Sequence, residues 1–407
     1  MNNEVVITGL GIVSSLGCEI ESFWERIKIG ETGIRPLSKL NPDRYNESCV
    51  SSEIKEEIES PFKNESNCLN YAHHAIKNAL KDALIKDTSK YEIGLILGTT
   101  NGNDDILQTI VDNAIPQEEK SANAGLQTLK VMKNKLGLFR SNPERLSSLL
   151  SKQFDFRGKS SVIQTACAAG NYALAEAYEK IKCGQSSIMI AGGVDAFNRS
   201  CYSVFYRLGG MTYDTCRPFA ENRTGMVVGE GAGILVVESK EHAQKRGATI
   251  YAEIKGVGFS CDAYHPVAPH PEGYGAYLAI NNALQQSGLD SGSVDLISTH
   301  GTGTKANDNQ EYEALSKVFK GHLDNIPILT SKANLGHCMG AASAIESIIS
   351  VLSIRDGTVP PNVNTNQVDS NFKNLRISSE AVVREIKNVL NNAFGFGGNI
   401  CSVIIGK

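Results

Sequence analysis

Cys167 is the side chain of this sequence best suited to act as a nucleophile. It lies in SVIQTACAAG, residues 161–170, where a strand-like run at 162–165 gives way to a helix-like run at 168–182. Unpaired backbone N–H groups and the helix dipole at a helix N-terminus favour an anion. They are expected to lower the thiol pKa and so to promote nucleophilic attack. From this segment alone, a buried structural cysteine remains an open interpretation.

Two further segments offer histidine and lysine directly after apolar runs. His300 follows the run 294–299 in VDLISTHGTGT, and Lys332 and His337 follow the run 326–330 in SKANLGHCMG. Ligands of open α/β sheets bind at the carboxyl ends of strands, so these side chains are expected to share a site with Cys167. Each alone would be interpreted as a loop histidine or a surface lysine, but their combination is much less easily obtained by chance.

The elements that must position these residues alternate between apolar strand-like runs and amphipathic helix-like runs. This pattern indicates sheets covered by helices on both faces, and therefore an α/β fold. The expected strands are 5–8, 93–98, 187–191, 233–238, 250–254, 294–299 and 326–330. The expected helices are 69–85, 168–182, 274–286, 309–319 and 341–355. A polar stretch at 116–142 interrupts this alternation and is expected to be a surface excursion, or part of a dimer or carrier-protein surface.

Composition excludes several classes of function. The 407 residues carry a net charge of −4, with 41% hydrophobic and 21% charged residues, so neither nucleic acid nor a membrane is an expected partner. The ten cysteines are dispersed without a C-x-x-C pair, which argues against a zinc site and for a reduced, cytoplasmic protein. No secretory signal or membrane-spanning apolar run is recognised.

Three other patterns are expected to carry no chemistry. GLGIVS at 9–14 begins like a dinucleotide fingerprint but has serine in place of the third glycine and no clean βαβ unit after it. GEGAG at 229–233 precedes a strand rather than a helix, so it is not a phosphate loop. His73 and His74 are expected to face solvent on their helix.

Taken together, the motifs resemble those of the β-ketoacyl-acyl-carrier-protein synthases, in particular synthase II and the ketosynthase α subunits of type II polyketide systems. The resemblance runs from VVITGLGIVSSLG to NNAFGFGGN and includes TACAAG, CRPFAENRTGMVVGEGAG, HGTGTKAND and SKANLGHCMGAASAIES. It implies a dimer with a thiolase-like fold, in which two similar halves stack as α-β-α-β-α layers. The halves are expected at residues 1–248, with the nucleophile, and 249–407, with the histidines and lysine.

The resemblance also implies an acyltransferase that performs decarboxylative Claisen condensation, with no metal, nucleotide or redox cofactor. Cys167 would carry the acyl group, while His300 and His337 would stabilise an enolate from malonyl-acyl-carrier protein. The backbone N–H groups of Cys167 and Phe396 would form the oxyanion hole, and Phe394 and Phe396 a flexible gate.

The same resemblance suggests supporting roles for three further residues. Lys332 is expected to pair with Glu346 as an electrostatic organiser, and Asp308 to anchor the His300 loop. Met226 stands where fatty-acid synthases of the family usually carry phenylalanine, so the shape of the pocket is expected to differ.

Several alternatives stay open. A thiolase would use a second cysteine and one histidine, and a non-catalytic chain-length subunit would lack the nucleophile. Met226 and HGTGTKAND favour polyketide or polyene synthesis over fatty-acid elongation, with either a homodimer or a heterodimer containing a chain-length-factor-like subunit. Charge suggests four candidate residues for docking the acyl carrier protein: Lys130, Lys133, Lys135 and Arg207.

Overall fold

The computed structural model describes residues 3–45, 49–106, 108 and 139–407. Ten of its strands form one sheet, in the order β10-β9-β13-β14-β8-β1-β7-β6-β4-β5. Their bounds are β1 Val5–Val13, β4 Gly94–Gly98, β5 Ser160–Ile163, β6 Ile188–Asp195, β7 Gly231–Ser239, β8 Ala252–Cys261, β9 Leu296–Ser298, β10 Ile328–Leu329, β13 Asn388–Phe394 and β14 Asn399–Gly406. Two short ladders pair β2 (Arg35–Pro36) with β3 (Val50–Ser51), and β11 (Thr358–Val359) with β12 (Val382–Val383).

The same strand order occurs twice in this sheet, once in each half of the chain. In chain order, the strands of the first half are β1, β4, β5, β6 and β7, and those of the second are β8, β9, β10, β13 and β14. Counted from the edge of the sheet inward, each half places its third strand first, followed by its second, fourth, fifth and first strands. In each half the first strand pairs antiparallel with the last. A three-residue pairing of β1 with β8 joins the two. The topology is therefore that of an internal duplication.

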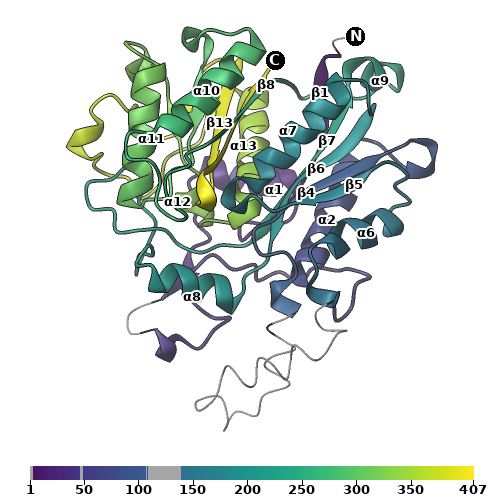
Figure 1. Ribbon diagram of the computed structural model, residues 1–407, viewed down its shortest axis with the longest axis horizontal. Helices are drawn as coiled ribbons and strands as arrows, with labels where there is room; N and C mark the ends of the chain where they lie inside the picture. The colour runs from purple at the N-terminus through teal and green to yellow at the C-terminus, as the bar shows by residue number, and fades with distance from the viewer. Residues whose placement is uncertain (1–2, 46–48, 107, 109–138) are drawn as a thin grey trace.

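Helices complete five layers. The principal ones are α1 Ile20–Lys28, α2 Asn67–Asp82, α6 Glu144–Gln153, α7 Ala169–Lys182, α8 Arg199–Arg207, α9 Lys240–Lys245, α10 Tyr274–Ser287, α11 Lys305–Val318, α12 Lys332–Leu335 and α13 Ala342–Asp356. Helices α2 and α6 cover one side of the molecule, α10 and α11 the other, and α7 and α13 lie between the two halves (Figure 1). Strands β1, β4, β6 and β7 are buried at every position because helices cover both faces.

Glycines allow unusually close contacts between these layers. A Cβ at Gly11 would lie 1.9 Å from the carbonyl oxygen of Ala75 in α2, and one at Gly233 would lie 2.7 Å from the amide of Ile345 in α13. The GLG and GEGAG segments are therefore packing sites between strands and helices. Similarly, a Cβ at Gly170 of α7 would lie 2.8 Å from the amide of Ala344 in α13, so the two central helices approach closely beside the nucleophile loop.

The α/β class and the layered architecture expected from the sequence are confirmed, but several elements were not anticipated. Strands β13 and β14 and helices α1, α6 and α8 were absent from the expected set. The prediction that His73 faces solvent is wrong: its ring is buried and stacks on Phe154 at 5.1 Å between ring centroids, with Phe62 edge-on at 5.7 Å. His74 is half-buried rather than exposed. Most of the 116–142 stretch lies outside the described residues.

We expect Gly170→Ala to lower the free energy of unfolding by about 1–3 kcal/mol, because its methyl group would overlap the backbone of α13. Urea denaturation measures the change. Gly292→Ala is the matched control, since a Cβ there meets only ordinary contact at 3.5 Å, and it should change stability by less than about 0.5 kcal/mol. Stabilisation of the Gly170→Ala protein, as helix propensity alone would give, would contradict this view of the α7–α13 contact.

Candidate active site

Cys167 lies in a tight, strained turn between β5 and α7. Ala166 begins a short 3-10 helix, Ala166–Ala168, with φ of 51°, in the left-handed region that non-glycine residues rarely adopt. This turn brings Cys167 to the N-terminal end of α7, as the sequence predicted. The residue is only 5% exposed.

The protonation state of Cys167 differs from the sequence-based expectation. Burial raises the pKa of the thiol to about 12, although the positive charge of Lys332 acts in the opposite direction. The prediction of a lowered thiol pKa is therefore wrong, because it considered the helix end and not the desolvation of the thiolate. At neutral pH the resting group is a thiol, so its proton must leave during acyl transfer.

His300 and His337 come together as the sequence predicted. Their ring centroids lie 5.3 Å apart with an interplanar angle of 84°, and both side chains are buried. Burial lowers the pKa of each imidazole well below its usual range, and the nearby Lys332 ammonium lowers both further. Both rings are therefore neutral at physiological pH, and each offers one N–H donor and one acceptor nitrogen. Among the described residues, neither Nδ1 atom has a hydrogen-bond partner.

Two buried carboxylates hold the His300 loop. Glu311 accepts hydrogen bonds from the amides of His300 at 2.8 Å and Gly301 at 2.9 Å. Asp308 accepts from the amides of Gly303 at 3.2 Å and Phe219 at 2.8 Å, so it ties the loop to the preceding half. Burial raises the pKa of Glu311 to about 7 and that of Asp308 to about 6. Asp308 was predicted from the sequence, but Glu311 was not. The sequence offered only one indication of its role, which is that it lies on the helix that follows His300.

His337 is fixed by backbone pairing with the other half. Its amide donates to Val227 at 2.7 Å, and its carbonyl accepts from Gly229 at 2.9 Å. Lys332, five residues earlier, donates to Glu346 with a separation of 2.6 Å, and both side chains are almost fully buried. Burial raises the pKa of Glu346, and the Lys332 charge opposes that rise.

The NAFGFGGN segment borders the same site. Phe394 packs against the His300 ring at 5.5 Å, and Phe396 packs against Phe205 of α8 at 5.4 Å. Gly397 and Gly398 have φ of 79° and 78°, which glycine adopts without strain. Within the described chain, the backbone N–H groups of Cys167 and Phe396 donate to no other group, so both are free to serve a ligand.

A pocket of about 390 Å³ brings most of these residues to one surface. The predicted site residues that line it are Cys167, His300, His337, Met226, Phe394 and Phe396. Lys332, Glu346 and Asp308 do not line the pocket. They influence the residues that do, by charge or by hydrogen bonds to the His300 loop. At the rim stand the exposed Leu208 and Lys305. No group of three metal-ligating side chains gathers anywhere in the described part of the chain.

The structure describes one of the four candidate docking residues. Lys130, Lys133 and Lys135 lie outside the described residues. Arg207 is exposed at the last residue of α8, next to the rim residue Leu208. No helix among the described residues is long and apolar enough to cross a bilayer.

Comparison with known proteins agrees with this geometry. The beta-ketoacyl synthase N-terminal domain matches residues 2–243, and the beta-ketoacyl synthase C-terminal domain matches residues 251–366. Nodulation protein E of Rhizobium sp. (strain N33) is 34% identical over 406 residues, 98% of this chain and 98% of that protein. The 3-oxoacyl-[acyl-carrier-protein] synthase 2 of Coxiella burnetii is 31% identical over 419 residues, 99% of this chain and 98% of that protein.

Solved structures give the same result. The ishigamide ketosynthase/chain length factor structure has a TM-score of 0.91 and 33% identity to this chain, with 100% of both chains covered. The fold and the matched domains define a ketosynthase-type acyltransferase with a thiolase-like fold. The chain belongs to the beta-ketoacyl synthase family.

The buried histidines make stability depend on pH. In the unfolded chain each imidazole binds a proton near pH 6.5, whereas the folded protein keeps both neutral. The unfolding free energy should therefore fall as pH decreases below about 6.5, by up to about 1.4 kcal/mol per pH unit for each histidine. Urea denaturation of the wild type and of a His300→Gln/His337→Gln variant should show a shallower fall in the variant.

The exposed His322→Gln variant is the matched control for loss of an imidazole. Identical pH dependence of the wild type and the double variant would show that the two rings are not held neutral by the fold.

Proposed function

We propose that this chain condenses an acyl group carried on Cys167 with malonyl-acyl-carrier protein, with loss of carbon dioxide, to give a 3-oxoacyl-carrier protein. The observation that carries the proposal is one pocket that contains a buried thiol, two neutral imidazoles 5.3 Å apart and two unoccupied backbone N–H donors. The substrates supply all the reacting atoms, so no cofactor enters the reaction.

In the first half-reaction, the sulfur of Cys167 attacks the thioester carbonyl of an acyl-phosphopantetheine. The Cys167 and Phe396 amides are positioned to stabilise the oxyanion. The carbon–sulfur bond to pantetheine then breaks, and the proton lost by Cys167 ends on the departing pantetheine thiol. A neutral imidazole can relay that proton because it has a free acceptor nitrogen.

In the second half-reaction, the bond between the malonyl methylene and its carboxylate breaks and carbon dioxide leaves. The electron pair remains as an enolate, whose oxygen accepts hydrogen bonds from His300 and His337. The enolate carbon attacks the acyl-Cys167 carbonyl, and the cysteine sulfur leaves. One preorganised donor of this kind contributes roughly 3–4 kcal/mol to the transition state.

Lys332 and Glu346 act on this chemistry from behind the pocket wall. The ammonium disfavours protonation of both imidazoles and favours the thiolate of Cys167, while the Glu346 carboxylate balances its charge. A reducing, cytoplasmic location is part of the proposal, since Cys167 must remain a free thiol.

The assembly is proposed to be a dimer. Among the described strands, β5 pairs only with β4, which leaves its outer edge open four residues before Cys167. An open strand edge is a ready surface for pairing with a second subunit. The solved ishigamide relative is a ketosynthase/chain length factor, which supports a heterodimer as well as a homodimer.

Polyketide or polyene synthesis is favoured over fatty-acid elongation by Met226 beside the nucleophile and by the ketosynthase/chain length factor similarity. The condensing reaction is common to both. The proposed boundary between the halves lies at 248–249, between the segments matched by the two family domains.

Two other functions are less well supported. A non-catalytic chain-length subunit would not need Cys167 in a strained turn at the pocket. A thiolase would use a second cysteine as acid or base, but Cys401 is buried in β14 and does not line the pocket.

Cys167→Ala should abolish both the acyl adduct and the elongated product. The wild type and the variant are incubated with acyl- and malonyl-carrier protein, and the intact protein mass, carbon dioxide and products are followed. An acyl adduct and a product two carbons longer, in the wild type alone, are expected. A wild-type adduct without carbon dioxide or extension, in the presence of its partner subunit, would contradict the proposal and favour a thiolase-like reaction.

Carrier-protein docking is expected at the pocket rim, where Arg207 and Lys305 stand on different helices. An Arg207→Glu/Lys305→Glu variant should raise the KM for carrier-bound substrate on the order of tenfold, because repulsion slows encounter with an acidic partner. Turnover of a small-molecule acyl thioester should be unchanged. Lys320→Glu, just beyond the other end of α11, is the control for reversal of a surface charge away from the rim. An equal loss in that control would exclude a specific docking role for the rim.

A further inference from the structure

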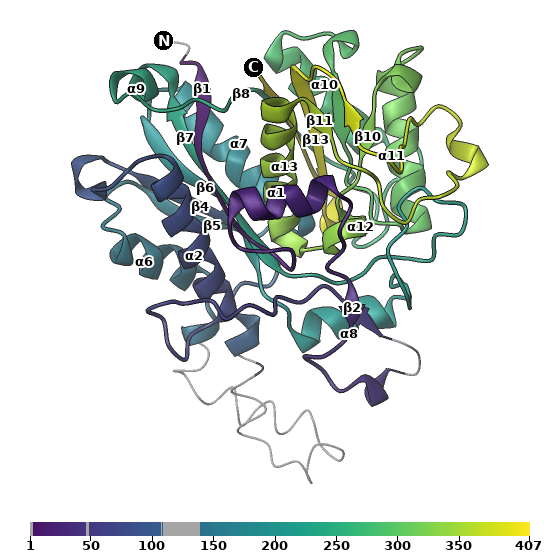
Figure 2. The same cartoon turned by 180° about the vertical axis from the view of Figure 1, so that it is seen from behind.

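His337 is carried by a strained turn, residues 336–340, between α12 and α13. The backbone of this turn is left-handed at Gly336, with φ of 64°, and again at Met339, with φ of 50°. A non-glycine residue in that region persists only where the surrounding structure over-determines it. Helix α13, which follows the turn, lies against β6 and β7 in both views (Figures 1 and 2), and the turn itself packs where β6 ends and β7 begins.

Two segments of the first half hold this turn by hydrogen bonds. The stretch 227–230, just before β7, forms two backbone hydrogen bonds with the histidine, and the Cys338 thiol donates to the carbonyl of Glu230 at 3.3 Å. At the other end of the turn, the amide of Gly340 donates to the carboxylate of Asp195, the last residue of β6, at 2.6 Å. Both ends of the turn are therefore fixed by the half of the chain to which it does not belong.

Asp195 is completely buried, and its carboxylate accepts four hydrogen bonds. One oxygen accepts from the amides of Gly340 and Thr100, the latter at 2.7 Å. The other accepts from the Thr99 hydroxyl and the Asn101 amide, both at 2.9 Å. Burial raises the pKa of Asp195 to about 6, while these hydrogen bonds oppose the rise. Only a carboxylate offers enough acceptor sites for four donors.

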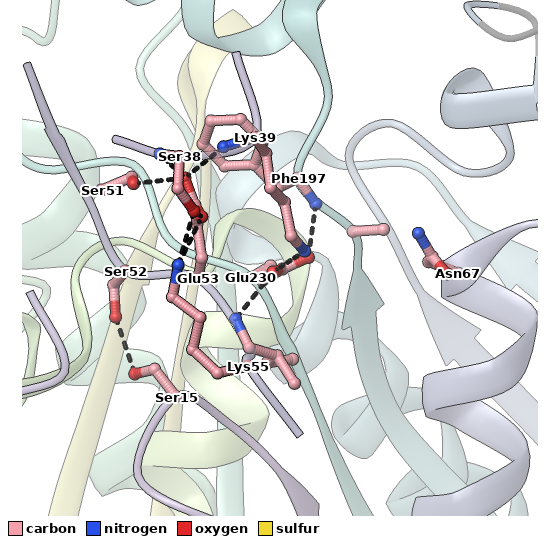
Figure 3. A network of polar contacts seen from close by, with 12 residues as sticks. Ser15, Ser38, Lys39, Ser51, Ser52, Glu53, Lys55, Asn67, Phe197 and Glu230 are labelled. Carbon is pink, nitrogen blue, oxygen red and sulfur yellow. Dashed lines mark hydrogen bonds and ion pairs between the residues drawn. The ribbon is translucent and has the colours of Figure 1, made fainter. Parts of the chain in front are cut away.

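Glu230 fixes the second segment (Figure 3). It is also buried, and it accepts hydrogen bonds from four groups outside its own strand: the amides of Phe197 at 2.9 Å and Ile54 at 2.8 Å, the Tyr71 hydroxyl at 3.1 Å, and Lys39. Phe197 lies two residues beyond Asp195, so its bond to Glu230 ties together the two segments that hold the turn. We call Asp195 and Glu230 the carboxylate clamp.

The clamp is separated from the reacting atoms. Neither Asp195 nor Glu230 lines the active-site pocket, whereas His337 does. The Asp195 charge also raises the pKa of the Cys167 thiol, but that effect disappears when the cysteine is replaced by alanine. In such a variant, the hydrogen bonds that hold the turn are the remaining connection between the clamp and the site.

We propose that Asp195 and Glu230 are positioning residues for decarboxylation, which hold the turn in the shape that directs the His337 imidazole at the enolate oxygen. This inference rests on the proposed function and deepens it, because it gives two carboxylates outside the pocket a part in the reaction. A catalytic group displaced by about 1 Å can cost on the order of 100-fold in rate, so loosening the clamp should slow carbon dioxide release without weakening substrate binding.

The test measures carbon dioxide release from malonyl-acyl-carrier protein in a Cys167→Ala background, using the full chain in its native assembly. Asp195→Ala should lower kcat by about 10- to 100-fold with KM unchanged, because the amide of Gly340 loses its acceptor. Asp195→Asn should keep most of the rate, because its carbonyl oxygen can still accept from Gly340 while its NH₂ group donates to the Thr99 hydroxyl.

Asp82→Ala is the matched control and should leave kcat unchanged. Asp82 also accepts from a backbone amide, that of Leu10 at 2.8 Å, and from a hydroxyl, that of Tyr251 at 2.9 Å. Within the described chain, these partners belong neither to the turn nor to the clamp.

Addition of His337→Ala separates positioning from a general structural effect. Once His337 is gone, Asp195→Ala should cause less than about a twofold further loss, whereas it should keep its full effect in a His300→Ala background. Equal losses in the two backgrounds would show that Asp195 supports the site in general. An unchanged rate in a folded Asp195→Ala protein would also overturn the proposal.

Should Asp195→Ala fail to fold, Glu230→Gln decides the matter. The amides of Phe197 and Ile54 bond to different oxygens of Glu230, so a glutamine can accept from only one of them, and the same dependence on His337 is expected. If the Cys167→Ala protein and the wild type both release no carbon dioxide, the proposed function itself is wrong and this inference falls with it.

Discussion

The Lys332–Glu346 ion pair is almost fully buried behind the pocket, and after burial itself its ammonium has the largest influence on the pKa of Cys167, His300 and His337. The ammonium acts on both imidazoles and on the thiol, and it reaches them through a medium from which water is excluded. Buried pairs of this kind contribute little net stability, since desolvation of the two charges offsets their attraction. The pair is therefore expected to matter more for the charge that it supplies to the site than for the stability of the fold.

Burial has opposite effects on the two kinds of catalytic group. It keeps His300 and His337 neutral, as hydrogen-bond donors to a developing enolate require, but it also keeps Cys167 protonated at rest. The site resolves this conflict with geometry: the thiol stands at a helix start, beside free amides and near imidazoles that can take its proton. A dry pocket also strengthens each donor at the moment when charge develops on the substrate.

The sequence allowed the principal site residues to be predicted, because Cys167, His300, Lys332 and His337 lie after apolar strand-like runs, in motifs that resemble those of a known family. It did not allow β13 to be recognised, since Asn391 and Asn392 interrupt the apolar pattern that predicts a buried strand. The fold gives one end of each amide a partner: Asn391 donates to the Ser347 hydroxyl at 2.8 Å, and Asn392 accepts from the Ser402 hydroxyl at 2.8 Å. Asn391 Oδ1 and Asn392 Nδ2 are buried without a partner among the described residues. The pKa of Cys167 and the burial of His73 depended on distant partners that local spacing does not reveal.

In the proposed mechanism, the histidine pair, and not the cysteine, drives decarboxylation. The most direct test is carbon dioxide release from malonyl-acyl-carrier protein by a Cys167→Ala protein, compared with the same protein that also carries His337→Ala. The first variant should still release carbon dioxide without forming an acyl adduct, and the second should be slower by about 100-fold or more. Equal rates in the two proteins, or no release from the first, would contradict it.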